Sequence, residues 1–342
     1  MNKAIVVLIL VIIGVAAIAI HFNKEEEKVI TIFHAGSLAG PFGDLEKKFE
    51  LQHPGIDVQR EVAGSAATIR KVTELGKNAD IVASADYTLI QTMMIDSEPK
   101  YANYYIQFAS NQMVLAYTDA SVYNKDINQT NWFKILMKGG VKFGFSNPND
   151  DPCGYRALMV IQLAEIYYNN DTIFDKLIEN NTGIYGFMEN GTYSIIVPET
   201  PNINPKNKIM MRSAEIDLMA LLETGEIDYL FIYKSVAYQR EDAGIHFLEL
   251  PAKIDLSKEQ YEDFYKQVHV ITSSGNITGK PIIYGLTIPK NAENPDLAVE
   301  FIEMLLSEAG RDILTKNGQT PITPAICSNK EELPDALKPY VI

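Results

Sequence analysis

The sequence predicts an α/β protein of two lobes with a cleft between them. Three strand–turn–helix units follow one another over residues 29–86, and this order indicates a parallel sheet whose loops gather at the carboxyl ends of its strands. A second such unit begins near residue 141. Two extended segments, 104–117 and 280–289, are placed to carry the chain out of the first lobe and back into it. Clefts between lobes joined in this way close on ligands.

In the first lobe, apolar strands alternate with segments whose apolar residues recur at helical spacing. Phe42, Leu45 and Phe49 share one face of the first helix, which ends at the sequence His53-Pro54-Gly55. The predicted elements are a strand at 29–35, a glycine-rich turn at 36–40, a helix from Pro41, a strand at 56–62, a turn at 63–67, a helix carrying Ile69, Val72 and Leu75, and a strand at 79–84.

The second lobe is predicted to span residues 111–279, and the first lobe residues 29–110 and 280–342. Segment 180–212 is poor in helix signals and rich in Asn, Gly and Pro, so we expect a surface excursion there, apart from a strand at 193–197. The other predicted elements are a helix at 132–138, a strand at 141–146, a helix at 152–168, a helix at 214–223 capped by Ser213, strands at 228–235 and 247–250, and a final helix from Pro295.

The decapeptide 147–156, Asn-Pro-Asn-Asp-Asp-Pro-Cys-Gly-Tyr-Arg, joins a strand to a helix. Pro152 suits the first helical turn, which places Asp151 near the N-cap and leaves the next backbone N–H groups without helical partners. Such a helix start binds anions. The acid pair Asp150 and Asp151 is unexpected at an anion-binding position and marks this segment as the centre of the candidate site.

The composition is that of a soluble globular chain, with 46% apolar and 22% charged residues, and 342 residues suffice for two domains. The formal charge is −14, and no cluster of Lys or Arg interrupts it. This balance argues against nucleic acid or an anionic membrane face as a partner. An anionic ligand would have to be recognised by local dipoles, because the overall field opposes it.

Residues 1–28 are predicted to be a signal sequence or a short membrane anchor. Behind Lys3, the segment Ala4–Ile20 is a run of 17 apolar residues, and a charged run at 24–28 follows it. A membrane span needs about 20 residues, so this run is marginal for crossing a bilayer. Either interpretation exports the remainder of the chain to the outer face of the cell membrane.

The two cysteines, Cys153 and Cys327, exclude a disulfide framework and a CxxC metal site and leave one bridge between them open. A catalytic interpretation would use His34 with the neighbouring Ser37, as in an extracytoplasmic hydrolase. No G-x-S-x-G motif accompanies them, and no H-E-x-x-H or similar spacing indicates a metalloenzyme. We therefore expect no enzymatic activity and no cofactor.

The candidate site collects residues that lie at strand ends or in first helical turns. Their backbone N–H groups, two serine hydroxyls and a phenol suit a compact oxyanion held by hydrogen bonds without a formal positive charge. The competing interpretation is that Ser and Gly only build turns and that the two acids only complement helix dipoles. The candidate residues are Gly36, Ser37, Ser65, Asp151, Cys153, Glu215 and Tyr233.

Five segments are informative together: Phe33–Leu38, Gly64–Ala66, the decapeptide, Arg212–Glu215 and Tyr229–Ser235. From about residue 29 to the Gly318–Pro321 region, the chain resembles the archaeal tungstate/molybdate-binding proteins of ABC importers. The Asp-Asp-Pro-Cys-Gly-Tyr-Arg and Ser-Ala-Glu pieces carry most of this resemblance, since His-Ala-Gly-Ser-Leu occurs across the wider ModA-like group.

The resemblance implies a two-lobed periplasmic-binding-protein fold of type II. It also implies a monomer without enzymatic activity that binds tungstate or molybdate and delivers it to a permease with its ATPase. A receptor for another oxyanion, sulfate or phosphate, is the alternative.

The resemblance also implies roles for the candidate residues. One Asp and one Glu would complete the coordination shell of the metal in the oxyanion, although the adjacent Asp150 leaves the register of the first acid open. Arg156 could equally point to solvent and is not assigned to the site. The implied metal ligands are Asp151 and Glu215, and the implied hydrogen-bond donors to the oxo groups are Gly36, Ser37, Ser65, the Cys153 N–H and Tyr233.

Overall fold

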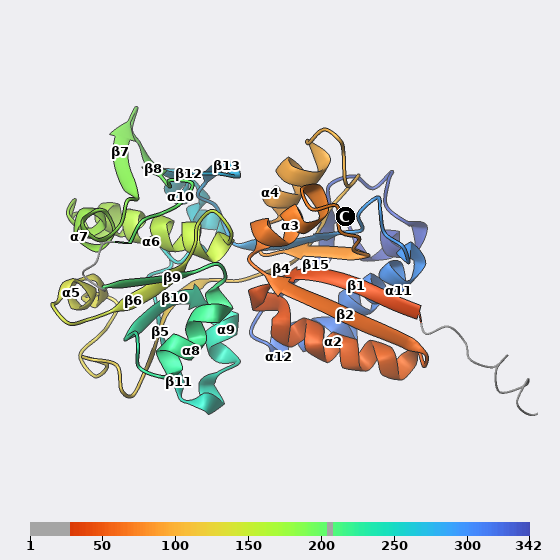
Figure 1. Cartoon of the computed structure of the whole chain (residues 1–342), viewed down its shortest axis with the longest axis horizontal. Coiled ribbons are helices and arrows are strands. Elements are labelled where there is room, and N and C mark those ends of the chain that lie inside the picture. The colour runs from red at the N-terminus through yellow and green to blue at the C-terminus, as the bar shows by residue number, and fades with distance from the viewer. Residues whose placement is uncertain (1–27, 204–207) are drawn as a thin grey trace, which may run out of the picture.

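The computed structural model describes residues 28–203 and 208–342, so the predicted leader lies outside the described residues. The chain forms two α/β lobes side by side, and the first lobe holds both the beginning and the end of the described chain (Figure 1). In the two described ranges, no helix is both long enough and apolar enough to cross a bilayer.

The first lobe is built on a six-stranded mixed sheet in the order β15–β4–β14–β3–β1–β2. β1 pairs in parallel with β2 and β3, whereas β14 and β15 run antiparallel to β4. The predicted succession of strands and helices over residues 29–86 is confirmed. The strands are β1 Lys28–Ala35, β2 Ile56–Ala63, β3 Ile81–Ser84, β4 Ile106–Ser110, β14 Ile283–Thr287 and β15 Thr320–Cys327.

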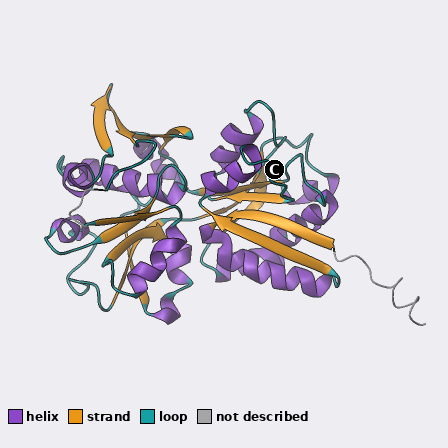
Figure 2. Ribbon diagram, in the orientation of Figure 1, coloured by secondary structure: helices purple, strands orange, loops and turns teal. Residues whose placement is uncertain are grey.

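Helices lie on both faces of this sheet (Figure 2). Phe42, Leu45 and Phe49 are fully buried, as their spacing predicted. Leu75 was predicted to belong to the second helix, but α3 ends at Thr73 and Leu75 is 69% exposed. A second helix follows the one predicted as final. The helical elements are η1 Gly36–Leu38, α2 Ala39–Gln52, α3 Ser65–Thr73, α4 Tyr87–Ile90, η2 Gln91–Ile95, α11 Pro295–Leu306, α12 Glu308–Lys316 and η7 Asp335–Tyr340.

The second lobe contains a five-stranded sheet in the order β11–β5–β10–β6–β9. Its strands are β5 Met113–Thr118, β6 Phe143–Ser146, β9 Ile209–Arg212, β10 Tyr229–Tyr233 and β11 Ile245–Glu249. Its helical elements are α5 Trp132–Met137, α6 Pro152–Tyr168, α7 Ile173–Leu177, η3 Glu179–Asn181, η4 Glu215–Leu218, α8 Met219–Glu223, α9 Lys234–Tyr238, η5 Glu241–Ala243, η6 Glu259–Tyr261 and α10 Glu262–Tyr265.

Strands β7, β8 and β9 run through segment 180–212, where a mostly irregular excursion was expected, and the predicted strand at 193–197 is confirmed as β8. β7 and β8 belong to a separate four-stranded sheet in the order β13–β12–β8–β7. β7 and β8 pair as an antiparallel hairpin, and β8 pairs in parallel with β12. β7 stands out from the second lobe (Figure 1), whereas β12 packs against α6. The strands are β7 Tyr185–Glu189, β8 Thr192–Ile196, β12 Val268–Thr272 and β13 Gly275–Thr278.

The chain crosses between the lobes where β4 passes into β5, with only Asn111 and Gln112 between these strands. The Asn111 N–H donates to the carbonyl of Ile282 at 3.2 Å, which ties this crossover to the returning one. The Asn111 side chain donates to Ser235 Oγ at 2.7 Å and to the Tyr284 hydroxyl at 2.8 Å. The lobe boundaries at residues 110–111 and 279–280 stay a prediction.

Ser213 does not cap the helix that follows it. The segment starts as the single turn η4, with Ala214 at the N-cap, and continues as α8. The Ser213 hydroxyl donates instead to Asp150 Oδ2 at 3.1 Å. The N–H of Glu215 is bound by the carboxylate of Asp151, which belongs to another helix start.

Candidate functional site

Helix α6 begins as the sequence predicted, with Asp151 as N-cap and Pro152 in the first turn. Asp151 Oδ1 accepts the N–H of Cys153 at 3.1 Å, and Oδ2 accepts the N–H of Glu215 at 2.9 Å. The Asp151 side chain therefore joins two helix starts. Each carboxylate oxygen has more than one lone pair, so these bonds leave Asp151 able to contact a ligand as well.

Glu215 lies beside Asp151, and both side chains are 1% exposed. Within the described residues, neither carboxyl oxygen of Glu215 has a hydrogen-bond partner. Burial and the nearby charge of Asp151 raise the pKa of Glu215 well above its usual value. The raised pKa favours the neutral acid in this structure, so Glu215 becomes an anionic ligand at low cost only when a positively charged or metal centre lies next to it.

Gly36 brings the first lobe against this acid. A Cβ on Gly36 would lie only 3.1 and 3.2 Å from the two Glu215 carboxyl oxygens, so the absence of a side chain allows the close approach. The next residue, Ser37, is buried, and its Oγ accepts the hydroxyl hydrogen of Tyr284 at 3.0 Å. Gly36 and Ser37 of the first lobe thus lie at the predicted acid of the second lobe.

Ser65 starts α3 and is fully buried. Its Oγ accepts the N–H of Ala85 at 2.9 Å. The next two residues, Ala66 and Ala67, donate their N–H groups to the carbonyl of Asp150 at 3.0 and 3.2 Å. The amino end of α3 in the first lobe therefore docks directly on the decapeptide of the second lobe.

The two adjacent acids have different environments. The Asp150 carboxylate accepts hydrogen bonds from Arg70 Nη1 at 3.2 Å and from Asn147 Nδ2 at 2.7 Å, and it is partly exposed. The Asp151 carboxylate is buried beside Glu215. This geometry favours Asp151 as the ligand-facing acid and gives Asp150 a role in lobe contact.

Tyr233, the last residue of β10, is fully buried, and its oxygen accepts a hydrogen bond from Arg156 Nη1 at 2.7 Å. Arg156, which the sequence interpretation left outside the site, is only 2% exposed. Its Nη1 also donates to the carbonyl of Ala85 at 2.7 Å, and its Nη2 lies 3.2 Å from Asp86 Oδ2. Arg156 is a buried part of the lobe boundary and does not face solvent.

Asp86 anchors this cluster from the first lobe. Its carboxylate accepts the Tyr155 hydroxyl at 2.7 Å and lies 3.2 Å from Lys280 Nζ. Burial alone would raise the pKa of Asp86, but the charges of Lys280 and Arg156 outweigh it and hold the pKa well below its usual range. Asp86 follows directly after a buried strand, and this strand-end position was the sequence signal that could have identified it.

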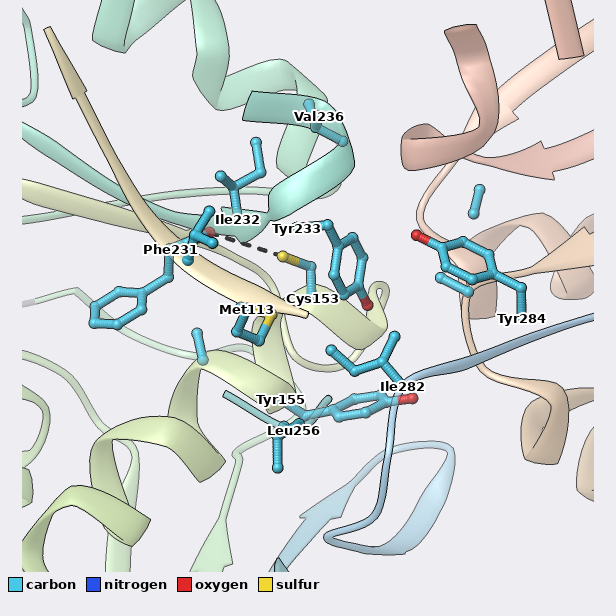
Figure 3. Packing of buried hydrophobic residues seen from close by; sticks show 14 of the residues in the cluster. Met113, Cys153, Tyr155, Phe231, Ile232, Tyr233, Val236, Leu256, Ile282 and Tyr284 are labelled. Atoms are coloured by element: carbon cyan, nitrogen blue, oxygen red, sulfur yellow. Dashed lines mark hydrogen bonds between the residues drawn. The ribbon is translucent and has the colours of Figure 1, made fainter. Parts of the chain in front are cut away.

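The thiol of Cys153 is a buried structural group. Its sulfur points at the carbonyl of Phe231, 3.7 Å away, with Tyr233 beside it (Figure 3). Burial raises the pKa of this thiol well above its usual value, which disfavours the reactive thiolate. Both Cys153 and Cys327 are free, so the bridge left open by the sequence is not formed. The Cys153 N–H, the predicted donor, is bound to Asp151 in this structure.

His34 and Ser37 do not form the pair that a hydrolase would need. Arg60 Nη1 lies 3.3 Å from His34 Nε2, and because arginine can only donate, Nε2 accepts and Nδ1–H donates to the carbonyl of Ala35 at 2.8 Å. Both ring nitrogens are thereby engaged. Ser37 has Tyr284 as its partner.

A cleft of about 790 Å³ reaches the site from solvent along the lobe boundary. Gly36 and Arg60 line it from the first lobe, and Ile216 and Gln239 from the second. Gly36 also contacts Glu215, so the cleft ends close to the buried acids. In the described part of the chain, no three His, Cys, Asp or Glu side chains gather as they would around a resident metal ion.

Comparison with curated proteins confirms the resemblance stated from the sequence. The chain is 47% identical over 317 residues to an uncharacterized solute-binding protein of Methanococcus maripaludis, with 92% of this chain and 88% of that protein covered. It is 43% identical over 328 residues to the molybdate/tungstate-binding protein WtpA of Pyrococcus abyssi, with 93% and 91% covered. The WtpA of Thermococcus kodakarensis is 41% identical, with 93% and 89% covered.

Solved structures confirm the predicted type II periplasmic-binding-protein fold. The periplasmic molybdate-binding protein of Azotobacter vinelandii superposes with a TM-score of 0.59 at 16% identity, covering 85% of this chain and 98% of that one. The sulfate-binding protein SubI of Mycobacterium tuberculosis gives 0.58 at 14% identity, covering 86% and 87%. Because residues 30–320 also match the model of the bacterial extracellular solute-binding proteins, the chain belongs to that family.

Proposed function

We propose that this protein captures tungstate or molybdate between its lobes outside the cytoplasm and delivers the oxyanion to an ABC permease. The observation that carries this proposal is the pair of buried carboxyl groups, Asp151 and Glu215, of which Glu215 has no hydrogen-bond partner in the described chain. The identity with the two molybdate/tungstate-binding relatives supports the choice of ligand.

The carboxyl pair selects against ordinary tetrahedral anions. Carboxylates that face the oxygens of a desolvated dianion repel it by an amount on the order of several kcal/mol. They become favourable only if they reach a central atom that accepts further ligands. Mo(VI) and W(VI) are large and hard enough to do so, whereas sulfur in sulfate and phosphorus in phosphate are not. Asp151 and Glu215 would therefore coordinate the metal and reject sulfate and phosphate.

Three hydroxyl groups are prepared to donate to the oxo groups. The oxygens of Ser37, Ser65 and Tyr233 each accept a hydrogen bond, and in each case this leaves the hydroxyl's own hydrogen free to point elsewhere. Accepting from a fixed donor turns each hydroxyl into a preorganised donor toward the ligand.

Membership of the solute-binding family supports the proposed delivery partners. A solute-binding protein of an importer presents its closed, loaded form to a permease that an ATPase drives. We propose that the protein acts as a monomer at the outer face of the cell membrane, exported and either released or held by residues 1–28. We assign it neither enzymatic activity nor a cofactor.

Isothermal titration of the purified full chain with tungstate, molybdate, sulfate and phosphate tests the choice of ligand. We expect tight binding of the first two anions and at least about a hundred-fold weaker binding of the other two, since the repulsion has no compensation there. Equal affinity for sulfate would reduce the protein to a general oxyanion receptor.

X-ray absorption spectroscopy of the tungstate complex tests the coordination directly. Tungsten bonded to the two carboxylates has six oxygen neighbours, whereas an anion held only by hydrogen bonds keeps four. A four-coordinate tungsten would show that Asp151 and Glu215 do not reach the metal.

A further inference from the structure

Arg156, Asp86 and Tyr155 are buried at the lobe boundary with the partly buried Lys280 beside them, and this cluster lies next to a predicted ligand donor. Arg156 and Asp86 are 2% and 1% exposed, so water does not satisfy their charges. Arg156 stands in the first turns of α6, whereas Asp86 follows β3 of the first lobe. The ion pair therefore exists only when the lobes are together.

Arg156 fixes the direction of one hydrogen bond. Guanidinium groups stay charged in proteins and have no acceptor, so the Tyr233 oxygen, 2.7 Å from Arg156 Nη1, must accept. The same nitrogen donates to the Ala85 carbonyl, and this second bond sets the plane of the guanidinium. A phenol has a single hydrogen, which must then point away from Arg156.

Asp86 holds Arg156 in that position. Asp86 Oδ2 faces Arg156 Nη2 at 3.2 Å and also accepts the Tyr155 hydroxyl at 2.7 Å. Asp86 Oδ1 accepts the Thr88 N–H at 2.9 Å as the N-cap of α4 and pairs with Lys280. Each carboxylate oxygen of Asp86 thus contacts more than one group, and such supporting contacts are typical of a preorganised site.

We propose that Arg156 is a positioning residue: Asp86 holds it across the lobe boundary, and it directs the Tyr233 hydroxyl hydrogen toward the bound oxyanion. This inference rests on the proposed function, because it needs an oxyanion that receives the phenol hydrogen bond. Ala85 and Asp86 belong to the first lobe, whereas Arg156 and Tyr233 belong to the second. Arg156 is therefore held in place only when the lobes are closed, and Tyr233 becomes an oriented donor only then.

A double-mutant cycle tests whether Arg156 acts through Tyr233. Tungstate affinity is measured by titration for the full chain and for Arg156→Lys, Tyr233→Phe and the double variant. We expect each single change to weaken binding about ten-fold or more, the loss typical of a hydrogen bond to a charged group. In the Tyr233→Phe background, Arg156→Lys should cost at least about five-fold less than alone.

Controls separate positioning from general damage. Arg311→Lys changes an arginine that donates to the Leu306 carbonyl in the first lobe, and its cycle with Tyr233→Phe should show independent effects. Thermal unfolding without ligand verifies folding. If the lysine variant does not fold, Arg156→Gln provides the second cycle with the same expected coupling.

The outcomes are distinct. If the fold-losses of tungstate affinity in Arg156→Lys and Tyr233→Phe multiply in the double variant, the two residues act independently. Arg156 then contacts the ligand or only joins the lobes, and the positioning role is wrong. Wild-type affinity in Arg156→Lys has the same meaning. If the unmodified chain binds neither tungstate nor molybdate, the proposed function fails, and this inference fails with it.

Discussion

Glu215 is the single residue on which tungstate binding should depend most. In Glu215→Gln the amide cannot serve as an anionic ligand, so we expect affinity for tungstate to fall more than about ten-fold. Stability should change little, because the carboxyl oxygens make no hydrogen bond within the described residues. Titration and thermal unfolding measure the two effects, with the exposed Glu226→Gln as control. Unchanged affinity would remove Glu215 from the coordination shell.

His34 should make stability depend on pH. Burial, the largest cause, and the charge of Arg60 lower its pKa from 6.5 to about 4, although the bond to Ala35 opposes this. Between these two pH values the unfolded chain binds a proton that the folded chain does not. The free energy of unfolding should therefore fall by about 3 kcal/mol as the pH drops from 6.5 to 4, and above pH 6.5 this contribution is fully present.

Urea unfolding at pH 7 and pH 4.5 measures this effect. Other groups titrate in the same range, so the comparison is made with His34→Gln. This change replaces the imidazole by a polar amide that does not titrate. The variant should lose less stability between the two pH values than the wild type. Equal losses would show that His34 does not protonate on unfolding.

Local sequence signals located part of the site. Pro152 and the preceding acid defined the N-cap, and Glu215 follows a recognisable turn. Asp86 follows a recognisable strand end, but no local signal paired it with Arg156, because the two residues are 70 positions apart and belong to different lobes. Sequence reasoning therefore found the chain segments of the proposed site and missed the buried ion pair that lies next to them.

Among the elements, β7 was the clearest miss, whereas the predicted strand at 193–197 is confirmed as β8 Thr192–Ile196. All four side chains of β7 are exposed, and its one half-buried residue is Gly186, so the strand has no buried face from which a period-two pattern could arise. The signal that remained was the dipeptide Asn190-Gly191, which forms the two-residue loop with φ of 52° and 82°. Asn-Gly is the strongest short-range sign of such a hairpin.

This loop gives a prediction for a single element. Gly191 has a φ of +82°, where alanine is disfavoured, so Gly191→Ala should destabilise the hairpin by about 1 kcal/mol. Amide hydrogen exchange in β7 and β8 should become faster while exchange in β10 stays the same. Gly139→Ala is the matched control, because no atom lies within 4 Å of its added Cβ and its φ is not positive. Equal exchange in both variants would contradict the expected strain.

At the scale of the whole molecule, the two crossovers decide which residues face each other across the lobes. The extended segments 104–117 and 280–289 were predicted from sequence; β4 and β14 lie within them, and β5 extends one residue beyond the first. The contacts that close the lobes were not predictable, because they join side chains and carbonyls on separate lobes. The docking of α3 on Asp150 is the main example, since it depends on how the two lobes meet.

Gly64 permits this docking, and replacing it should keep the lobes apart. An added Cβ would lie 2.4 Å from the Asp150 carbonyl oxygen and 2.8 Å from Asp151 Cβ, and the carbonyl is backbone that cannot turn aside cheaply. The φ of −60° and ψ of 147° at Gly64 are ordinary for alanine, so the first lobe itself is not strained.

Gly64→Ala should therefore weaken tungstate binding more than about ten-fold with little loss of stability, because Ser65 and Asp151 no longer meet around the ligand. Small-angle scattering should show wild type contracting on addition of tungstate and Gly64→Ala contracting less, with Gly139→Ala as control. Wild-type affinity in Gly64→Ala would mean that the lobes close around the oxyanion without the contact between α3 and Asp150. Lost binding with a lowered melting temperature would place the damage in the fold instead.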